Sequence, residues 1–297
     1  MAEKINVILN AFGGRLGEQA KLALIEQAMQ TAGLDYHLEL TQYAGHATEL
    51  ARQAILDGWP IVVAAGGDGT IHEVINGFML AAEKNHAATF GIIPMGTAND
   101  LADGLQLPHD AAAACQRIAA GNTRLIDIGI VNGRFFANNS AVGLEPVVTI
   151  NHEQMRRVKG NLRYLLAAFK SIVQARPWQM HLIWDEGSYE GPVTLVSVGN
   201  GRRSGGLFYM TPQAELDDGL LDIVFAGGLT RWQILTFLPK TLKGTHINDP
   251  LVTYRKTSSL SIISSPSTPI HADGEVIERE ALEINYSILP NKLRIII

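Results

Sequence analysis

The sequence predicts two domains: an N-terminal doubly wound parallel α/β domain and a C-terminal antiparallel domain that is β-sandwich-like. Three observations support this prediction. The chain has 297 residues, which favours two domains of ~150 residues each. Strand and helix patterns alternate up to residue 126, and short β segments separated by turns follow. We place the first domain at residues 1–127, with the tail 288–297 as a candidate to complete it, and the second at residues 128–287.

The first domain is expected to alternate strands with amphipathic helices. Residues 61–65 are continuously apolar, as expected for a strand that is buried on both faces. Strands of this kind, joined by helices, form parallel sheets with helices on both sides. The expected strands are residues 5–9, 36–41, 61–65 and 89–94, and the expected helices are residues 22–32, 47–55, 71–82 and 111–120.

The second domain is expected to be mostly antiparallel. The dipeptide Asn132-Gly133 stands beside short apolar runs, which is the pattern of a two-residue hairpin turn. Further apolar runs are separated by turn residues, and two longer amphipathic patterns predict helices. The strands are expected near residues 135–136, 179–184, 193–198, 221–225 and 259–263, and the helices at residues 154–174 and 230–242.

Composition narrows the class of protein. A net charge of −5 argues against a general nucleic-acid-binding protein, which would carry a basic surface. No apolar run approaches the ~20 residues of a membrane-spanning helix. The single Cys115 excludes an intrachain disulfide and lies in a helical pattern, so we expect it to pack in the core rather than act as a nucleophile. These features favour a cytoplasmic protein.

The run Gly66-Gly67-Asp68-Gly69-Thr70 follows a buried strand and precedes a helix. Glycines let the backbone approach a phosphate closely, and the free N–H groups of a helix start favour an anion. Thr70 with Glu73 has the spacing of a capping box, so a tight turn before a capped helix is the alternative reading. The spacing fits neither a Walker A nor a Rossmann motif.

Two more glycine loops follow strands of the same domain. Residues 94–100 carry Gly96-Thr97-Ala98-Asn99-Asp100, and residues 13–15 read Gly-Gly-Arg. Because the carboxyl ends of parallel strands meet at one edge of a sheet, these loops are expected to gather there. Such a gathering exceeds what turn formation alone requires, and it predicts a phosphate-bearing ligand.

These segments resemble the bacterial diacylglycerol kinase and YegS-type lipid kinase family. The resemblance covers nearly the whole chain, although the Gly66–Thr70 pattern alone is shared with NAD kinases. It departs from the family at residues 137–145, which end in Glu145 where Asp is usual. The matching segments are residues 66–77, 96–100, 127–129, 199–201, 205–206, 212, 216–222 and 273–275.

The resemblance implies an ATP-dependent lipid kinase with its active site in a cleft between the domains. It implies Mg²⁺ as a catalytic ion at Asp68 and as a structural ion at Asp218, the latter with backbone oxygens of Glu215 and Leu220. A solvated acidic turn is the alternative for Asp218. The residues implied for ATP are Asn10, Arg15, Thr41, Gly66, Gly67, Asp68, Gly69, Thr70, Glu73 and Thr97.

The same resemblance assigns Glu275 as proton acceptor for a lipid hydroxyl. A base within hydrogen-bond reach of that hydroxyl would assist phosphoryl transfer. Asp273 lies two residues away, and on a strand both acids would share one face, so we include Asp273 among the catalytic candidates. A hairpin turn at Asp273-Gly274 is the alternative reading.

A lipid substrate implies access to a membrane surface. Residues 153–176 carry six basic residues and one acid beside an apolar set, as in helices that lie on anionic bilayers. Arg156, Lys159, Arg163 and Lys170 fall at helical spacing there. An amphipathic helix packed on the second domain is the alternative. Peripheral membrane association is therefore expected, and a homodimer is left open.

Two rival functions share some of these features. An NAD kinase would share the Gly66–Thr70 loop but not the later motifs, and a nucleotide-sensing regulator would need no catalytic acids. Within the lipid kinases, the sequence does not distinguish diacylglycerol from phosphatidylglycerol as the acceptor, because pocket shape makes that choice.

Overall fold

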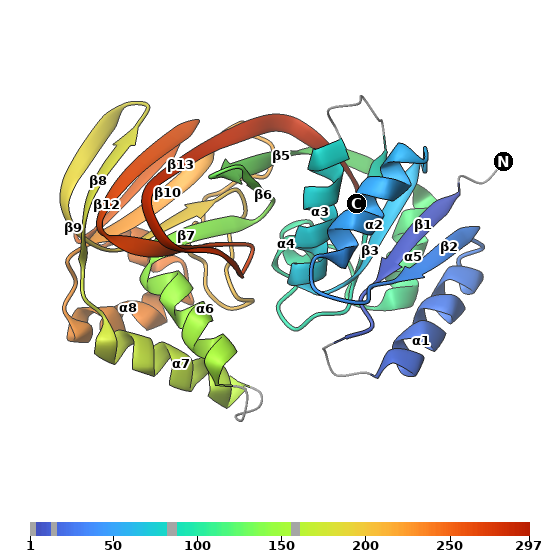
Figure 1. Cartoon of the computed structure of the whole chain (residues 1–297), viewed down its shortest axis with the longest axis horizontal. Helices are drawn as coiled ribbons and strands as arrows, with labels where there is room; N and C mark the ends of the chain where they lie inside the picture. Colours follow the sequence, from blue (N-terminus) through green and yellow to red (C-terminus); the bar gives the residue numbers. More distant parts are fainter. Residues whose placement is uncertain (1–3, 13–16, 82–87, 156–160) are drawn as a thin grey trace. The chain divides into compact units, whose positions relative to one another are not determined.

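The computed structural model describes residues 4–12, 17–81, 88–155 and 161–297, the last range with side chains from residue 166 onward (Figure 1). The chain forms two compact units. Unit 1 is Met1–Ile128 with Asn291–Ile297, and unit 2 is Gly129–Pro290. Strands β5 (Thr123–Val131) and β13 (Glu275–Ile296) each pass from one unit into the other. The predicted combination of an α/β domain with an antiparallel β domain is confirmed.

Unit 1 is built on a parallel sheet in the order β2-β1-β3-β4-β13. The end of β13 lies parallel to β4, with Ile295 opposite Phe90, so the apolar tail of the chain is a strand of this sheet. Parallel pairing throughout brings the carboxyl ends of β1, β3 and β4 to one edge. The first four strands are β1 (Ile5–Leu9), β2 (Tyr36–Leu40), β3 (Ile61–Gly66) and β4 (Thr89–Pro94).

Helices cover both faces of this sheet because its central strands are apolar on both sides. Val63 packs in the core under α1 and α5, and Phe90 meets Phe78 of α3 edge to face. Cys115 is fully buried in α5, and burial raises the pKa of its thiol to about 11, which fits a packing role. The helices are α1 (Glu18–Thr31), α2 (His46–Leu56), α3 (Asp68–Ala81), α5 (Ala111–Ala120) and a short α4 (Asp100–Gly104) that the sequence did not indicate.

Unit 2 is an antiparallel sheet in the order β11-β10-β9-β7-β12-β13, with β8 pairing both β9 and β12. Asn132 and Gly133 both have positive φ in the turn from β5 to β6, as the hairpin prediction requires. The remaining strands are β6 (Arg134–Phe136), β7 (Asn139–Gly143), β8 (Trp178–Trp184), β9 (Gly187–Gly199), β10 (Leu221–Gly227), β11 (Val252–Thr257) and β12 (Ser259–Ala272).

Three helices lie together at one end of this sheet: α6 (Leu144–Gln154), α7 (Asn161–Gln174) and α8 (Arg231–Thr241) (Figure 1). A short 3₁₀ helix, Thr245–Asn248, follows α8. The prediction of one helix over residues 154–174 was incomplete, because α6 begins ten residues earlier. Gly143, with φ of 84°, turns the chain out of β7, and Pro146 sits in the first turn of α6 where its missing N–H costs nothing.

Asp185 joins the β8–β9 turn to the β11–β12 turn. Its carboxylate accepts hydrogen bonds from the backbone N–H of Ser258 at 2.6 Å and the hydroxyl of Ser259 at 2.8 Å. These bonds, the backbone one foremost, hold the pKa of Asp185 at about 2. A carboxyl group with a depressed folded-state pKa stabilises the fold above its unfolded pKa, and that stabilisation is lost as the pH falls.

We therefore expect Asp185→Asn to lower the free energy of unfolding by about 1 kcal/mol or less at pH 7, because the side chain is exposed and screened. The difference from wild type should shrink as the pH falls from about 4 to about 2. Urea unfolding at both ends of this window measures it. A difference that persists undiminished below pH 2 would contradict a role for the carboxylate charge.

Candidate functional site

Two glycine loops meet at the carboxyl edge of the unit 1 sheet. A Cβ atom built on Gly96 would lie 2.5 Å from the Cα of Gly67, and one built on Gly67 would lie 3.0 Å from the Cα of Gly96. The loops after β3 and β4 therefore touch backbone to backbone, which only glycine at both positions permits. The arrangement leaves main-chain atoms rather than side chains at this edge, as phosphate binding requires.

Asp68 fastens the second loop to the first. Its Oδ2 accepts a hydrogen bond from the backbone N–H of Asn99 at 2.8 Å, and its Oδ1 accepts one from that of Asp100 at 2.7 Å. Both N–H groups belong to the start of α4, where a helix favours negative charge. Asp68 thus has a structural role that the sequence did not indicate, while its role as a Mg²⁺ ligand stays a prediction.

Asn10 and Thr70 connect the first strand to α3. The side-chain amide of Asn10 donates to the hydroxyl of Thr70 at 2.9 Å, and Lys21 Nζ donates to the carbonyl of Asn10 at 2.9 Å. Burial lowers the pKa of Lys21. The sequence missed Lys21, although its place one turn before Ile25 on the buried face of α1 is a readable signal.

The capping-box reading of Thr70 and Glu73 was wrong. Helix α3 begins at Asp68, so Thr70 lies inside it. The carboxylate of Glu73 instead caps α2, accepting hydrogen bonds from the backbone N–H groups of Gly45 at 2.7 Å and Ala47 at 3.1 Å. The hydrogen-bond partners of Glu73 lie far from it in the sequence. The spacing of residues within one helix does not reveal such partners. Nucleotide contact by Glu73 stays a prediction.

The other predicted ATP residues are placed as follows. Thr41 is buried after β2, with its N–H donating to the carbonyl of Leu9 at 3.0 Å. Thr97 is exposed in the second loop. Arg15 and its neighbouring glycines lie outside the described residues. Within the described ranges, no three His, Cys, Asp or Glu side chains gather into a metal site by themselves. A nucleotide-bound Mg²⁺ needs only one or two carboxylates, because phosphates supply other ligands.

In unit 2, Asp273 and Glu275 stand at the hairpin between β12 and β13. Asp273 and Gly274 have φ of 47° and 85°, so the alternative reading of a hairpin turn is correct. The expectation that the two acids share one strand face was therefore wrong. The Asp273 carboxylate accepts hydrogen bonds from the backbone N–H groups of Ala137, Asn138 and Asn139 at 2.9–3.0 Å, whereas Glu275 is exposed at the start of β13.

An ammonium group occupies the acidic turn that the sequence assigns to a structural metal. Lys256 Nζ lies 2.5 Å from Asp218 Oδ2 and 3.6 Å from Asp222 Oδ2. Burial opposes the charge of Lys256, but Asp218, Asp222 and Glu215 outweigh it and raise the pKa of the lysine. The residues around Asp218 fit a metal poorly while Lys256 is present. The metal site at Asp218, Glu215 and Leu220 stays a prediction.

Chelation tests this reading. Because Lys256 already supplies positive charge, we expect EDTA to leave the wild-type Tm unchanged. Lys256→Met should lower the free energy of unfolding by roughly 1–3 kcal/mol, since it leaves buried Asp222 beside Asp218 without a counterion. Added Mg²⁺ should recover part of this loss. Arg255→Met on the same strand is the control. A fall in the wild-type Tm on chelation would show that a metal neutralises these acids instead.

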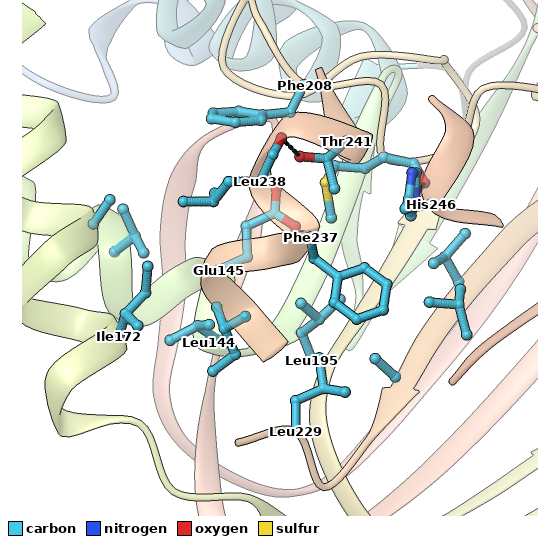
Figure 2. Close-up of a pocket in the computed structure, with 17 residues that line it drawn as sticks. Leu144, Glu145, Ile172, Leu195, Phe208, Leu229, Phe237, Leu238, Thr241 and His246 are labelled. Atoms are coloured by element: carbon cyan, nitrogen blue, oxygen red, sulfur yellow. Dashed lines mark hydrogen bonds between the residues drawn. The ribbon is translucent and has the colours of Figure 1, made fainter. Parts of the chain in front are cut away.

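Unit 2 also contains an apolar cavity of about 110 Å³ between its helices and its sheet (Figure 2). Among the described residues that line it, only Glu145, Thr241 and His246 are polar. The apolar lining comes from Leu144, Val148, Ala168, Ile172, Leu195, Phe208, Met210, Val224, Ala226, Leu229, Ile234, Phe237, Leu238 and Val252.

Glu145 lies at the polar part of this cavity. Its Oε1 accepts hydrogen bonds from Ser204 Oγ at 2.5 Å and Asn139 Nδ2 at 3.5 Å, and His271 Nε2 lies 3.4 Å away. Burial acts to raise the pKa of Glu145, but His271, Ser204 and Asn139 outweigh it, and the net shift is downward. Among the residues that the structure describes, Glu145 Oε2 is buried without a hydrogen-bond partner.

Both halves of the chain match domain families of known proteins. Residues 4–131 match the diacylglycerol kinase catalytic domain, and residues 139–297 match the YegS C-terminal NAD kinase beta sandwich-like domain. A diacylglycerol kinase of Bacillus subtilis (strain 168) is 31% identical over 275 residues, which is 92% of this chain and 90% of that protein. The chain belongs to the diacylglycerol kinase family. As a member, it is a lipid kinase.

Other relatives agree with this family. A diacylglycerol kinase of Staphylococcus saprophyticus is 29% identical, over 93% of this chain and 90% of that protein. A solved structure described as a putative diacylglycerol kinase from Bacillus anthracis str. Sterne has a TM-score of 0.80 and 26% identity, and covers 99% of this chain and 96% of that one. The two-domain architecture of the family is therefore present along the whole chain.

The lipid kinase has an exposed apolar stripe on α7. Leu166, Phe169 and Val173 lie at helical spacing and are 41%, 60% and 44% exposed, and Trp232 of the adjacent α8 is 79% exposed. Arg156, Arg157 and Lys159 of the predicted basic helix, and the side chain of Arg163, lie outside the described residues. Among the residues that the structure describes, no helix combines the length and apolar character needed to span a bilayer.

Proposed function

We propose that this lipid kinase transfers the γ-phosphate of ATP to a lipid hydroxyl, with diacylglycerol as the first acceptor to test. The observation that carries the proposal is the backbone contact between Gly67 and Gly96, fastened by Asp68, in a chain of the diacylglycerol kinase family. Two glycine loops and a helix start at one sheet edge suit the phosphates of a nucleotide.

In this proposal, different residues of unit 1 bind different parts of the nucleotide. Backbone N–H groups of the two glycine loops orient the phosphates, with exposed Thr97 within the second loop. Mg²⁺, bound to the phosphates and to Asp68, would neutralise charge on the transferring group. Arg15 is assigned to the same phosphates. Phosphoryl transfer depends mainly on such positioning and electrostatics.

In this proposal, residues of unit 2 act on the lipid hydroxyl. Glu275 is the proposed proton acceptor for the reacting hydroxyl. Asp273 positions Glu275, because its three backbone hydrogen bonds fix the turn that starts β13. We assign Asp273 this positioning role in place of a catalytic one.

Peripheral membrane association is part of the proposal. The apolar stripe Leu166, Phe169 and Val173, together with Trp232, offers groups that insert into the interface of a bilayer. The basic residues 156–163 would add attraction to anionic headgroups. The stripe supports this docking because a solvated helix face would not expose large apolar side chains at this spacing.

One assay tests the function. Purified protein is incubated with Mg²⁺ and radiolabelled ATP, together with a total lipid extract, diacylglycerol, phosphatidylglycerol or NAD in separate reactions. We expect label in a lipid and none in NAD. Label in NAD alone would favour an NAD kinase. ATP binding without transfer to any lipid in a broad panel would indicate a regulatory protein.

A further inference from the structure

We propose that Lys21 holds a fixed positive charge behind the phosphate-binding loops of unit 1, and that this charge strengthens nucleotide binding more as the nucleotide carries more phosphates. The inference rests on the proposed function, because it assigns a further residue to the same nucleotide site. Lys21 is a positioning residue in this assignment. It acts through the loop that follows β1 and through its charge, and it takes no part in proton transfer.

Lys21 lies where a charged side chain is unusual. It stands on the buried face of α1 together with Ile25, Ala28 and Met29, and only 4% of its surface is exposed. The three apolar side chains pack in the core between α1 and the sheet, beside β1 (Figure 1). Lysines are almost never fully buried, because burial removes the hydration of the ammonium group. The retained charge therefore indicates a role other than packing.

The ammonium group holds the loop that follows β1. Its Nζ donates to the backbone carbonyl of Asn10 at 2.9 Å and to that of Phe12 at 3.4 Å. Carbonyl oxygens carry only partial negative charge, so these two contacts orient the ammonium more than they neutralise it. Burial lowers the pKa of Lys21, which means that the surroundings oppose its charge. A phosphate bound nearby would offset that cost.

Asn10 connects Lys21 to the glycine loop after β3. Its side-chain amide donates to the hydroxyl of Thr70 at 2.9 Å, and its backbone N–H donates to the carbonyl of Ala65 at 3.0 Å. Its Oδ1 accepts the backbone N–H of Phe12 at 2.9 Å. In this hydrogen-bond network a single residue separates Lys21 from the loop that is proposed to bind the phosphates.

Close packing fixes this connection. A Cβ atom built on Gly66 would lie 2.5 Å from Thr70 Oγ1, so the hydroxyl that meets Asn10 also touches the backbone of the glycine loop. Charges inside a protein are screened less than charges at its surface, so a fixed ammonium can act on phosphates without touching them. The effect should grow from AMP to ATP, because each phosphate adds negative charge, and it should vanish for adenosine.

Nucleotide binding in the absence of lipid tests the charge. Lys21→Met removes the charge but keeps a long, unbranched apolar stem for the core. We expect this variant to bind ATP at least about tenfold more weakly than wild type. The loss should be smaller for AMP and absent for adenosine. Isothermal titration calorimetry with Mg²⁺ in every sample measures the three dissociation constants for each protein.

Lys4→Met is the matched control. Lys4 is exposed directly before β1, at the opposite edge of the same sheet, and the change removes the same charge from the same unit. All three affinities should equal those of wild type. Lys21→Gln is the second variant, because it keeps a side-chain N–H donor for the loop carbonyls and lacks the charge. It should lose ATP affinity as Lys21→Met does, whereas wild-type affinity would show that Lys21 only tethers the loop.

Other results would also overturn the inference. Equal losses for ATP, AMP and adenosine would show that Lys21 shapes the loop without acting through its charge. Failure of both Lys21 variants to fold, seen as a missing thermal transition, would likewise show a structural role. Because the assay contains no lipid, losses that grow with phosphate number support the inference even if no lipid is phosphorylated. Normal ATP binding by both variants would count against the inference alone, provided that wild type phosphorylates a lipid.

Discussion

Replacing Glu275 with glutamine is expected to reduce kcat for lipid phosphorylation by roughly 10²–10⁴-fold, the usual contribution of a positioned acid–base group. Glutamine keeps the size and an acceptor oxygen of the side chain but cannot take up the proton of the hydroxyl. Glu275 is exposed at the start of β13, so the substitution should leave the Tm unchanged. Initial rates with radiolabelled ATP at saturating lipid measure the effect.

Glu280→Gln is the matched control for this prediction. Glu280 is exposed on the same strand, five residues further along, and the change removes the same charge. Its activity should equal that of wild type. Full activity in Glu275→Gln would displace Glu275 as the proton acceptor, whereas equal losses in both variants would point to the overall charge of β13.

Asp68→Asn is expected to have the second large effect. The amide cannot accept both hydrogen bonds from Asn99 and Asp100, and it removes the negative charge at the start of α4. Loss of hydrogen bonds to a charged group should lower the free energy of unfolding by about 1.5–3 kcal/mol. Loss of the proposed Mg²⁺ ligand should lower kcat by roughly 10²–10³-fold, comparable to removing one electrostatic stabiliser of a transition state.

Titrating Mg²⁺ at saturating ATP separates the two roles of Asp68. If Asp68 binds the ion, the variant should need more Mg²⁺ for half-maximal rate; if it only fastens the loops, the rate falls without a change in that concentration. Asp57→Asn, at the exposed end of α2, is the control and should match wild type in both measurements. A fully active Asp68→Asn would contradict both roles.

Predictions that depend on local pattern succeeded because local forces decide them. The buried strand at residues 61–65 follows from its continuous apolar run, and the turn at Asn132-Gly133 follows from the backbone freedom of Asn and Gly. The helix α6 was missed because Gly143 directly precedes it and Pro146 lies in its first turn, and these residue types usually mark breaks rather than starts. The residue contacts of the site were harder to predict, since Glu73 and Asp218 are held by partners far along the chain.

By itself the sequence determined the alternating α/β half, the antiparallel half and the glycine loops, because these follow from short-range periodicity and turn chemistry. Its motifs also carried the family, since they recur in order along the whole chain. Only the tertiary structure decided what each acid does. Asp68 clamps a helix start, Asp273 holds a turn, Lys256 neutralises Asp218, and Glu145 faces an apolar cavity. A carboxylate takes its role from the donors that folding brings to it, and these lie tens of residues away.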